Sequence, residues 1–334
     1  MRIILDAFGG DNAPLEILRG AVQAKTDGAE ILLTGKEETI RRVAAENGLD
    51  LSGMEIADAP DIITMDDEPR SILKAHKDCS MAVGLRLLAE GKGDAFVSAG
   101  STGALVMGAT FFVKRIKGVP RAALAALIPT AAGKPSMLMD AGANAECRPE
   151  MLCQFAEMGS VYMSRVMGGG EPATVGLVNI GTEDHKGGDL QQQAFALIRD
   201  SGVNFIGNVE ARQVPFGAAD VLVADGFTGN VLLKTMEGTA GMLMKEVKNL
   251  FMTNLRTKIG GALVKPYIGG LKKQMDTREY GGAPVLGVCA PVIKAHGNSD
   301  ALAIRSAVRV ASQFAGAGVI EAITAAVKGA DTNE

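Results

Sequence analysis

Short, uninterrupted runs of Val, Ile, Leu and Ala recur along the chain. Each is followed by a glycine-containing turn and then by a longer segment of helical periodicity. Five such runs with their turns read RIILDAFGGD, DAFVSAGSTGA, PSMLMDAGAN, TVGLVNIGTED and DVLVADGFTGN. Strands that are apolar on both faces are typical of a sheet that is covered on both sides. With helices expected over 71–90, 149–167 and 188–200, the pattern predicts an α/β fold with a doubly wound, mostly parallel sheet.

The length of the chain sets the domain organisation. Its 334 residues suffice for one large α/β domain or for two lobes, because a single core stops growing near roughly 250–300 residues. No internal repeat or low-complexity linker divides the chain. We therefore expect a single α/β domain over 1–334, with GGGEPA at 168–173 as the candidate boundary between two lobes.

The segment 242–275 stands apart because it is basic and amphipathic. It holds seven lysines and arginines and one acid, a net +6 that leaves −10 for the other residues of a chain whose net charge is −4. Leu243, Val247, Leu250 and Phe251 fall on one helical face, and the glycine-rich stretch IGGALVKPYIGGL follows. The pattern predicts a helical hairpin with an apolar tip. Dimer packing with a solvated basic face is an alternative use of the same segment.

Composition narrows the possible functions. The net charge of −4, the pI near 5.6 and the absence of Trp give no general attraction to polyanions and few stacking surfaces for bases, so nucleic-acid binding is not expected. The cysteines show no C-x-x-C spacing and the N-terminus does not read as a signal peptide, so we expect a reduced, cytoplasmic protein. No apolar run approaches the ~20 residues of a spanning helix.

Two of the turns carry residues that suit an anion. In open α/β sheets, ligands bind beyond the carboxyl ends of the strands, where the amides of a helix start can face an anion. The turn SAGSTG supplies Ser98, Gly100, Ser101, Thr102 and Gly103. The turn DGFTGN supplies Thr228, Gly229, Asn230 and, one helical turn later, Lys234. The same residue types also cap helices without any ligand, so a phosphate site and plain helix caps are both open.

Other candidates have the same two interpretations. His296 in IKAHGNSD is either catalytic or a capping residue, and Lys186 in GTEDHKGG is by default a solvated loop residue. Asp6, Asp140 and Asp225, each at a strand end, act in the site or form Asx turns. The chain has no dinucleotide-binding G-x-G-x-x-G, P-loop, H-E-x-x-H or G-x-S-x-G motif, and its three histidines are far apart in sequence. Nucleotide hydrolysis, serine hydrolysis and a zinc or other metal site are therefore not expected.

Seven blocks of the sequence resemble the PlsX-type phosphate acyltransferases in order and spacing, from about residue 2 to about residue 328. They are LDAFGGDNAP, VSAGSTGAL, DAGAN, NIGTEDHKG, GNVEARQ, DVLVADGFTGNVLLKTMEG and YGGAPVLGVCAPVIKAHGNSD. The resemblance implies an enzyme that converts acyl-acyl-carrier-protein and inorganic phosphate into acyl phosphate and free carrier protein for phospholipid synthesis, with no cofactor. It also implies a homodimer with a three-layer fold like that of isocitrate and isopropylmalate dehydrogenases, related to phosphate acetyltransferase.

The matching blocks also imply where the site lies. The expected catalytic residues are Lys186, Asp225, Asn230, Lys234 and His296. The residues expected to bind phosphate or substrate are Asp11, Asn12, Ser98, Gly100, Ser101, Thr102, Gly103, Asn144, Asn179 and Gly229. Those expected to contact a membrane or the carrier protein are Lys245, Lys248, Leu250, Phe251, Lys272 and Lys273. The chain departs from the family in having Ser101 where Asn is usual, Phe8 where Met is common, Ala211 and Gln213 where the family has EGRD, and GVCAP in place of a glycine-richer stretch.

The implied reaction agrees with the missing serine motif, because phosphate itself attacks the thioester. We expect the amides of 100–103 and 229–230 to hold phosphate oxygens and Lys234 to balance their charge. His296 is expected to orient or protonate the leaving thiol.

A fatty product suggests where the enzyme works. We expect the basic hairpin to touch the inner face of the membrane, near a membrane glycerol-3-phosphate acyltransferase, or to dock the acidic carrier protein. Two other functions remain as alternatives: an NAD(P)- and metal-dependent hydroxy-acid dehydrogenase on the same fold, and a non-catalytic module that binds lipid or phosphoprotein.

Overall fold

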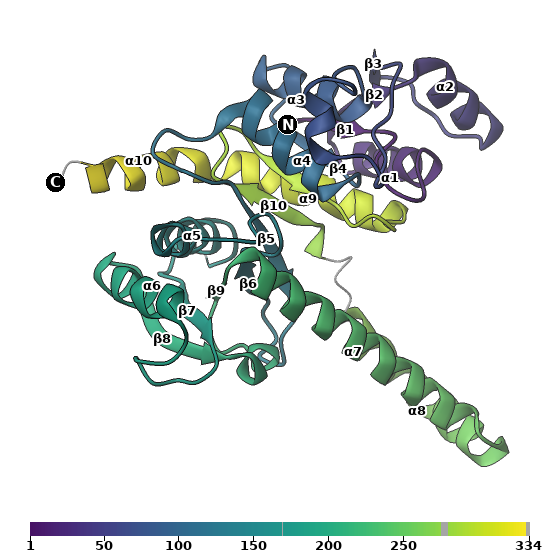
Figure 1. Cartoon of the computed structure of the whole chain (residues 1–334). Coiled ribbons are helices and arrows are strands. Elements are labelled where there is room, and N and C mark those ends of the chain that lie inside the picture. Colours follow the sequence, from purple (N-terminus) through teal and green to yellow (C-terminus); the bar gives the residue numbers. More distant parts are fainter. Residues whose placement is uncertain (169, 275–279, 332–334) are drawn as a thin grey trace.

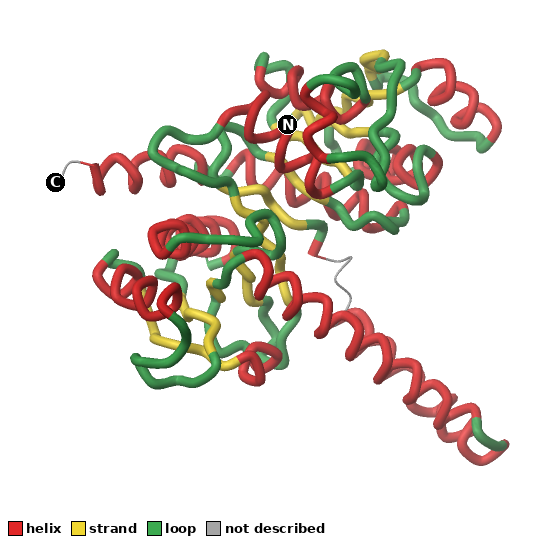
Figure 2. Tube along the Cα trace, in the orientation of Figure 1, coloured by secondary structure: helices red, strands yellow, loops and turns green. Residues whose placement is uncertain are grey.

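The computed structural model describes residues 1–168, 170–274 and 280–331, with side chains described up to 264 in the second range and 327 in the third. Its strands form one sheet in the order β3-β2-β1-β4-β11-β10-β5-β6-β9-β7-β8 (Figure 1; Figure 2). In chain order they are β1 (Arg2–Asp6), β2 (Glu30–Gly35), β3 (Glu55–Asp58), β4 (Ala95–Ser98), β5 (Ala123–Ile128), β6 (Ser136–Met139), β7 (Thr174–Asn179), β8 (Asn204–Glu210), β9 (Val221–Val223), β10 (Ala283–Leu286) and β11 (Val292–Lys294).

Helices connect these strands and cover both faces of the sheet. They are α1 (Leu15–Thr26), α2 (Glu37–Glu46), α3 (Ser80–Ala89), α4 (Thr102–Gly108), α5 (Pro149–Tyr162), α6 (Asp189–Asp200), α7 (Gly226–Met252), α8 (Leu255–Gln274), α9 (Ala301–Gly316) and α10 (Val319–Asp331). Two 3₁₀ turns span Pro69–Leu73 and Ala211–Phe216, and two π-helical turns, Ala109–Lys114 and Met163–Met167, extend α4 and α5. The helices expected over 149–167 and 188–200 are thus confirmed.

The sheet is mostly parallel, as predicted. Among the described strands, seven of ten pairings are parallel, and the antiparallel ones join β11, β10, β5 and β6 in the middle of the sheet. As a result, β6 and β9 run opposite to β4 and β11. The reversal alone would place the carboxyl ends of the two parallel halves at opposite edges of a flat sheet, yet residues that follow β4, β11 and β6 line one cleft.

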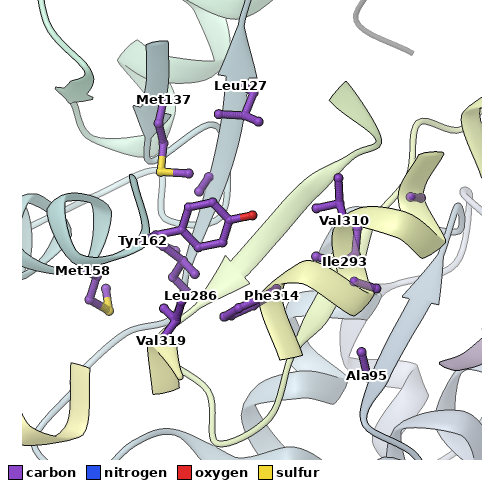
Figure 3. Close-up of a cluster of buried hydrophobic side chains, with 14 of the residues drawn as sticks. Ala95, Leu127, Met137, Met158, Tyr162, Leu286, Ile293, Val310, Phe314 and Val319 are labelled. Carbon is purple, nitrogen blue, oxygen red and sulfur yellow. The ribbon is translucent and has the colours of Figure 1, made fainter. Parts of the chain in front are cut away.

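The core has two layers, one on each face of the sheet. Neighbouring residues of β1 alternate between them: Ile3 and Leu5 belong to the cluster that includes α1, α5 and α9, whereas Ile4 belongs to the cluster that includes α3 and α4. This alternation is the two-residue period of a strand buried on both sides. Figure 3 shows part of the first cluster, in which the rings of Tyr162 and Phe314 pack edge to face and join α5 to α9. The centroids of the two rings are 5.3 Å apart. The expected three-layer architecture is confirmed.

One predicted helix is shorter than its apolar pattern. The expected helix over 71–90 is helical only from Ser80, after the 3₁₀ turn that ends at Leu73. The segment between is held by tertiary contacts: His76 Nδ1 lies 2.8 Å from Asp61 Oδ2, and the amide of Ser80 donates to the carbonyl of Asp61 at 3.1 Å. These contacts with a distant segment override the local helical period.

A long helical hairpin projects from the body of the molecule (Figure 1). Its first helix, α7, begins at Gly226, sixteen residues before the expected start at 242, because Asp225 caps it there. The turn falls at Thr253 and Asn254, so the glycine-rich stretch forms α8 and not the tip. Among the described helices, no single one is long and apolar enough to cross a membrane; only α9 together with 319–327, bent by 51°, meets the length and composition test.

Candidate active site

A cleft of about 710 Å³ lies over the central strands. Its walls come from β5, β10, β11, the starts of α4, α7 and α9, and the turn after β6. The lining residues are Met65, Thr102, Leu124, Ala126, Leu127, Ala141, Gly142, Asn230, Leu233, Lys234, Glu237, Tyr280, Gly281, Gly282, Ala283, Lys294, Ala295, His296, Gly297, Asn298, Ser299 and Ala303. Elements from both halves of the sheet thus share one cavity, at the carboxyl ends of β4, β6 and β11 where a ligand is expected.

The turn after β4 contributes Thr102 to the cleft, whereas its serines hold the turn itself. Ser98 is fully buried, donates to Asp6 Oδ2 at 2.6 Å and accepts from the amide of Gly100 at 3.0 Å. Ser101 caps α4 by accepting from the amide of Ala104 at 3.5 Å. The hydroxyls expected to bind phosphate at 98 and 101 are therefore engaged within the turn. The amides of Thr102 and Gly103, in the first turn of α4, have no acceptor within the helix.

Two further turns pack against this one. The amide of Asp11 donates to the carbonyl of Gly297 at 2.8 Å, and Asn12 Nδ2 donates to the carbonyls of Asn298 at 3.1 Å and Ser299 at 3.3 Å. Asp11 and Asn12 do not line the cleft; they hold the turn that carries His296. His296 itself is exposed at the cleft wall, with Nδ1 accepting from the amide of Asn298 at 3.4 Å.

Asp140 organises the turn after β6. Its carboxylate is fully buried and accepts from the amides of Leu124 at 2.9 Å and Asn144 at 2.7 Å, from the amides of 142 and 143, and from Asn144 Nδ2 at 2.8 Å. Burial raises the pKa of this carboxyl, and the surrounding donors oppose that rise. The carbonyl of Asn144 in turn accepts from the amide of Gly226 at 2.7 Å, which anchors the start of α7. Asn144 therefore positions the site and does not line it.

The start of α7 brings Asn230 and Lys234 to the cleft. Asp225 caps the helix by accepting from the amide and the hydroxyl of Thr228, both at 2.8 Å. Gly229 allows close approach, because a Cβ at this position would lie 1.9 Å from the carbonyl oxygen of Asp140. The amide of Gly229 donates to the carbonyl of Asp225 at 2.8 Å, so it cannot hold a phosphate as expected from the sequence. The turn therefore offers the side chain of Asn230 in place of that amide.

Two expected site residues lie elsewhere. Asn179 ends β7 and uses its Nδ2 to donate to the carbonyl of Lys186 at 3.0 Å and to Asn208 Oδ1 at 3.0 Å. Lys186 lies in the following loop with its Nζ 3.9 Å from Glu183 Oε1. Neither residue lines the cleft. The loop after β7 is thus built by these side chains and is separate from the cavity.

Sequence reasoning missed Lys294 and Ser299. Lys294 ends β11 opposite Ser98 of β4, and its Nζ donates to the carbonyls of Ala99, at 3.3 Å, and Ala295. Burial and the nearby charge of Lys234 lower the pKa of Lys294 to about 8. Ser299 is buried, lines the cleft and has a hydroxyl without a hydrogen-bond partner in the described structure. The one available signal for Lys294 was a lysine that ends an apolar strand directly before the histidine turn.

The cleft is suited to an anion that carries an apolar group. Lys234, Lys294, His296 and Asn230 supply cationic or hydrogen-bonding groups. Leu124, Ala126 and Leu127 of β5 supply apolar surface together with Leu233. Lys234 is half exposed and its Nζ pairs with Glu237 at 2.8 Å. Within the described ranges, no group of three or more His, Cys, Asp or Glu side chains could hold a metal ion.

The residues expected at a membrane or carrier protein lie on the hairpin. Lys245 and Lys248 are exposed on α7, and Leu250 is exposed near the tip together with Met252 and Leu255. Phe251 lies against α8, where a Cβ at Gly261 would be 3.0 Å from it. The side chains of Lys272 and Lys273 lie outside the described residues.

Comparison with known proteins agrees with this architecture. The family model described as "Fatty acid synthesis protein" matches residues 1–322. The chain is 46% identical over 317 residues to the phosphate acyltransferase of Acetivibrio thermocellus, which covers 94% of this chain and 93% of that protein.

Solved structures show the same fold at low identity. A phosphotransacetylase from Streptococcus pyogenes superposes with a TM-score of 0.62 at 15% identity, over 96% of this chain and 94% of that one. A putative 4-hydroxythreonine-4-phosphate dehydrogenase from Salmonella typhimurium superposes with a TM-score of 0.56 at 12% identity, over 94% of this chain and 99% of that one. The expected relation to transacetylases and dehydrogenases in fold is thereby confirmed. With the match over nearly its whole length, the chain belongs to the PlsX-type phosphate acyltransferase family.

Proposed function

We propose that the protein transfers a fatty acyl group from acyl-acyl-carrier-protein to inorganic phosphate, which yields acyl phosphate and free carrier protein. The observation that carries the proposal is one cleft in which Asn230, Lys234 and His296 adjoin an apolar wall. A phosphate needs the polar groups, and an acyl thioester needs the apolar surface. Family membership, with relatives named phosphate acyltransferase, supports the same reaction class.

The proposed chemistry needs no nucleophile from the protein. A phosphate oxygen attacks the thioester carbonyl carbon, the new C–O bond forms, and the C–S bond breaks as the thiolate leaves. Thr102 and Asn230 orient the phosphate, Lys234 contributes positive charge, and His296 protonates the thiolate, whose free pKa is about 8.5. Removing one preorganised donor of this kind typically lowers the rate by about 10²–10³.

The test is a reaction of the full chain with long-chain acyl-carrier protein and phosphate. Free carrier thiol and a hydroxylamine-reactive acyl product should appear together and only when phosphate is present. His296→Ala and Asn230→Ala should slow both, whereas Lys92→Ala, an exposed lysine paired with Glu90, serves as the matched control. Thiol release without an acyl phosphate product would refute the proposal. Absorbance of NAD(P)H with hydroxy-acid substrates tests the dehydrogenase alternative.

We further propose that the hairpin brings the enzyme to anionic lipid, where a membrane glycerol-3-phosphate acyltransferase can take the acyl phosphate into phospholipid synthesis. Lys245 and Lys248 are exposed beside an apolar tip, and each basic residue near an anionic surface adds roughly 1 kcal/mol. On this view the enzyme is cytoplasmic and binds the membrane surface peripherally. It would also form a homodimer, which sedimentation can measure, and the dimer would present two hairpins to the membrane.

Flotation with anionic vesicles tests the membrane contact. We expect binding to be lost when four hairpin lysines are changed to Glu, namely Lys245, Lys248, Lys272 and Lys273. The control changes the same amount of charge elsewhere, at four exposed lysines: Lys36, Lys74, Lys92 and Lys117. Unchanged flotation of the hairpin variant, with a higher KM for acyl-carrier protein, would assign the patch to carrier docking instead.

A further inference from the structure

Lys294 is unusual because its charge is buried. Among the lysines and arginines whose side chains the structure describes, it is the only one with less than 9% of its surface exposed, at 8%. Taking an ammonium out of water is costly unless it is paired. Within that same part of the chain, no carboxylate lies within ion-pair distance of its Nζ, which is held instead by two backbone carbonyls, those of Ala99 and Ala295.

The ammonium of Lys294 has one more donor than its two backbone partners take. An ammonium has three N–H donors, and the two carbonyls take two of them. The carbonyl of Ala99 begins the turn that leads to Thr102, so the ammonium is fixed beside the turn that lines the cleft. The third donor and the full positive charge are available to a ligand there.

Lys234, the cation that the sequence suggested, is less suited to this task. Its side chain is 54% exposed and already paired with Glu237 at 2.8 Å. An exposed ion pair contributes little because water screens it. A buried ammonium acts in a lower dielectric and interacts more strongly with an anion.

Ser299 provides an independent observation that points to a ligand. The residue is only 3% exposed, its hydroxyl has no partner in the described structure, and it lines the same cleft as Lys294. A buried hydroxyl without a partner costs free energy that a bound polar group would recover. Lys294, with one N–H that the two carbonyls leave open, and Ser299, with a hydroxyl that has no partner, therefore line one cavity.

We propose that Lys294 and Ser299 bind the phosphate substrate directly, with Lys294 as its main counter-charge. This deepens, and rests on, the acyl transfer to phosphate proposed above. Lys294 is then a substrate-binding residue that also offsets charge on phosphate during its attack, and Lys234 plays a secondary part at the mouth of the cleft.

The lowered pKa of Lys294, about 8, gives the proposal a pH signature. Above that pH the free enzyme loses the positive charge, so the affinity of the wild type for phosphate should fall. The affinity of a variant without the lysine should not show this fall. The charges of Lys234 on α7, of Asp11 and of Asp6 at the end of β1 act on this ammonium. The titratable residues Glu237, Tyr280 and His296 line the same cleft.

The experiment measures binding of inorganic phosphate to the full chain by isothermal titration calorimetry, without an acyl donor. We expect Lys294→Met to weaken binding at least about tenfold and Ser299→Ala to weaken it by a smaller factor, since the lysine supplies a full positive charge in addition to a hydrogen bond and the serine only a hydrogen bond. Lys92→Met, which removes an exposed lysine, should bind as the wild type does. In turnover, Lys294→Met should raise the KM for phosphate and leave the KM for acyl-carrier protein unchanged.

The outcomes separate this inference from the function on which it rests. Wild-type affinity for phosphate in Lys294→Met, or the same loss above pH 8 in both proteins, overturns the role of Lys294 and leaves acyl transfer intact. Absence of phosphate binding by the wild type overturns both. Should Lys294→Met fail to fold, Lys294→Gln keeps a donor for the two carbonyls without the charge and carries the same expectation.

Discussion

Replacing Lys294 with methionine should change how the stability of the fold depends on pH. The pKa of this lysine falls from 10.5 to about 8 in the folded chain, mainly because of burial. At about 1.4 kcal/mol per pKa unit, the buried charge costs about 3 kcal/mol at pH 7. Methionine has a similar length without the charge, so the variant does not carry that cost. It also loses the hydrogen bonds to Ala99 and Ala295, but that loss is the same at every pH.

The sign follows from proton binding. Between pH 8 and 10.5 the unfolded chain binds a proton at this lysine and the folded chain does not, so the free energy of unfolding rises with pH. The cost of the charge is fully present below pH 8 and is relieved as pH rises toward 10.5. The free energy of unfolding of the wild type, relative to the variant, should therefore increase by about 2 kcal/mol between pH 7 and pH 9.5.

The assay is urea unfolding of both proteins at pH 7, 8, 9 and 9.5. Titration of the cysteines also affects stability in this range, but it affects both proteins alike and cancels in the difference. Lys92→Met, an exposed lysine beside Glu90, controls for the loss of one positive charge and should give a flat difference. A flat difference for Lys294→Met as well would refute the argument that its ammonium is buried at a cost.

Three further predictions concern helix α7 and the four cysteines. Gly229→Ala should destabilise the fold by about 1–3 kcal/mol or more in urea unfolding, because the new Cβ would overlap the carbonyl of Asp140. Gly238 lies in open space on the same helix, so Gly238→Ala should stabilise the fold by about 0.5–1 kcal/mol. Equal effects of the two would contradict the close approach. Asp225→Ala should lower stability by about 1–2 kcal/mol through loss of the α7 cap, seen in thermal unfolding; an unchanged midpoint would rule out the cap. With a maleimide at pH 7.5, Cys289 should react first because it is exposed. Burial raises the pKa of the other three thiols, Cys79, Cys147 and Cys153, to about 11. Equal rates at all four cysteines would contradict this prediction.

The strands were predictable because burial on both faces of the sheet requires an uninterrupted run of apolar residues, which is visible in the local sequence. In β9, all three residues are buried, and the run DVLVADG shows an uninterrupted apolar stretch before its turn. The helix expected over 71–90 failed for the opposite reason. Its apolar spacing is helical, but the contact between Asp61 and His76 depends on a segment fifteen residues away, and no local pattern records it.

The turns of the site were predictable, but the direction of their side chains was not. Ser98 and Ser101 have the chemistry of phosphate ligands, and the structure uses both within the turn. Oxygen-bearing side chains satisfy backbone amides and ligands equally well. Which of the two they serve is decided by packing from elsewhere, as where Asp6 approaches Ser98 from β1.

Lys294 was not predicted because its burial beside the cleft results from the topology of the sheet. In sequence it is a polar residue at the end of a three-residue strand, a place where lysines usually reach solvent. In the fold, β11 lies between β4 and β10, and Lys294 is opposite both Ser98 and Ala283, so strands cover it on two sides. Asn230 on α7, which follows a strand of the half of the sheet beyond β10 and β5, lines the same cavity. The cost of burying this charge is imposed by the same strand order that creates the cleft, and binding an anion there is the arrangement that offsets it.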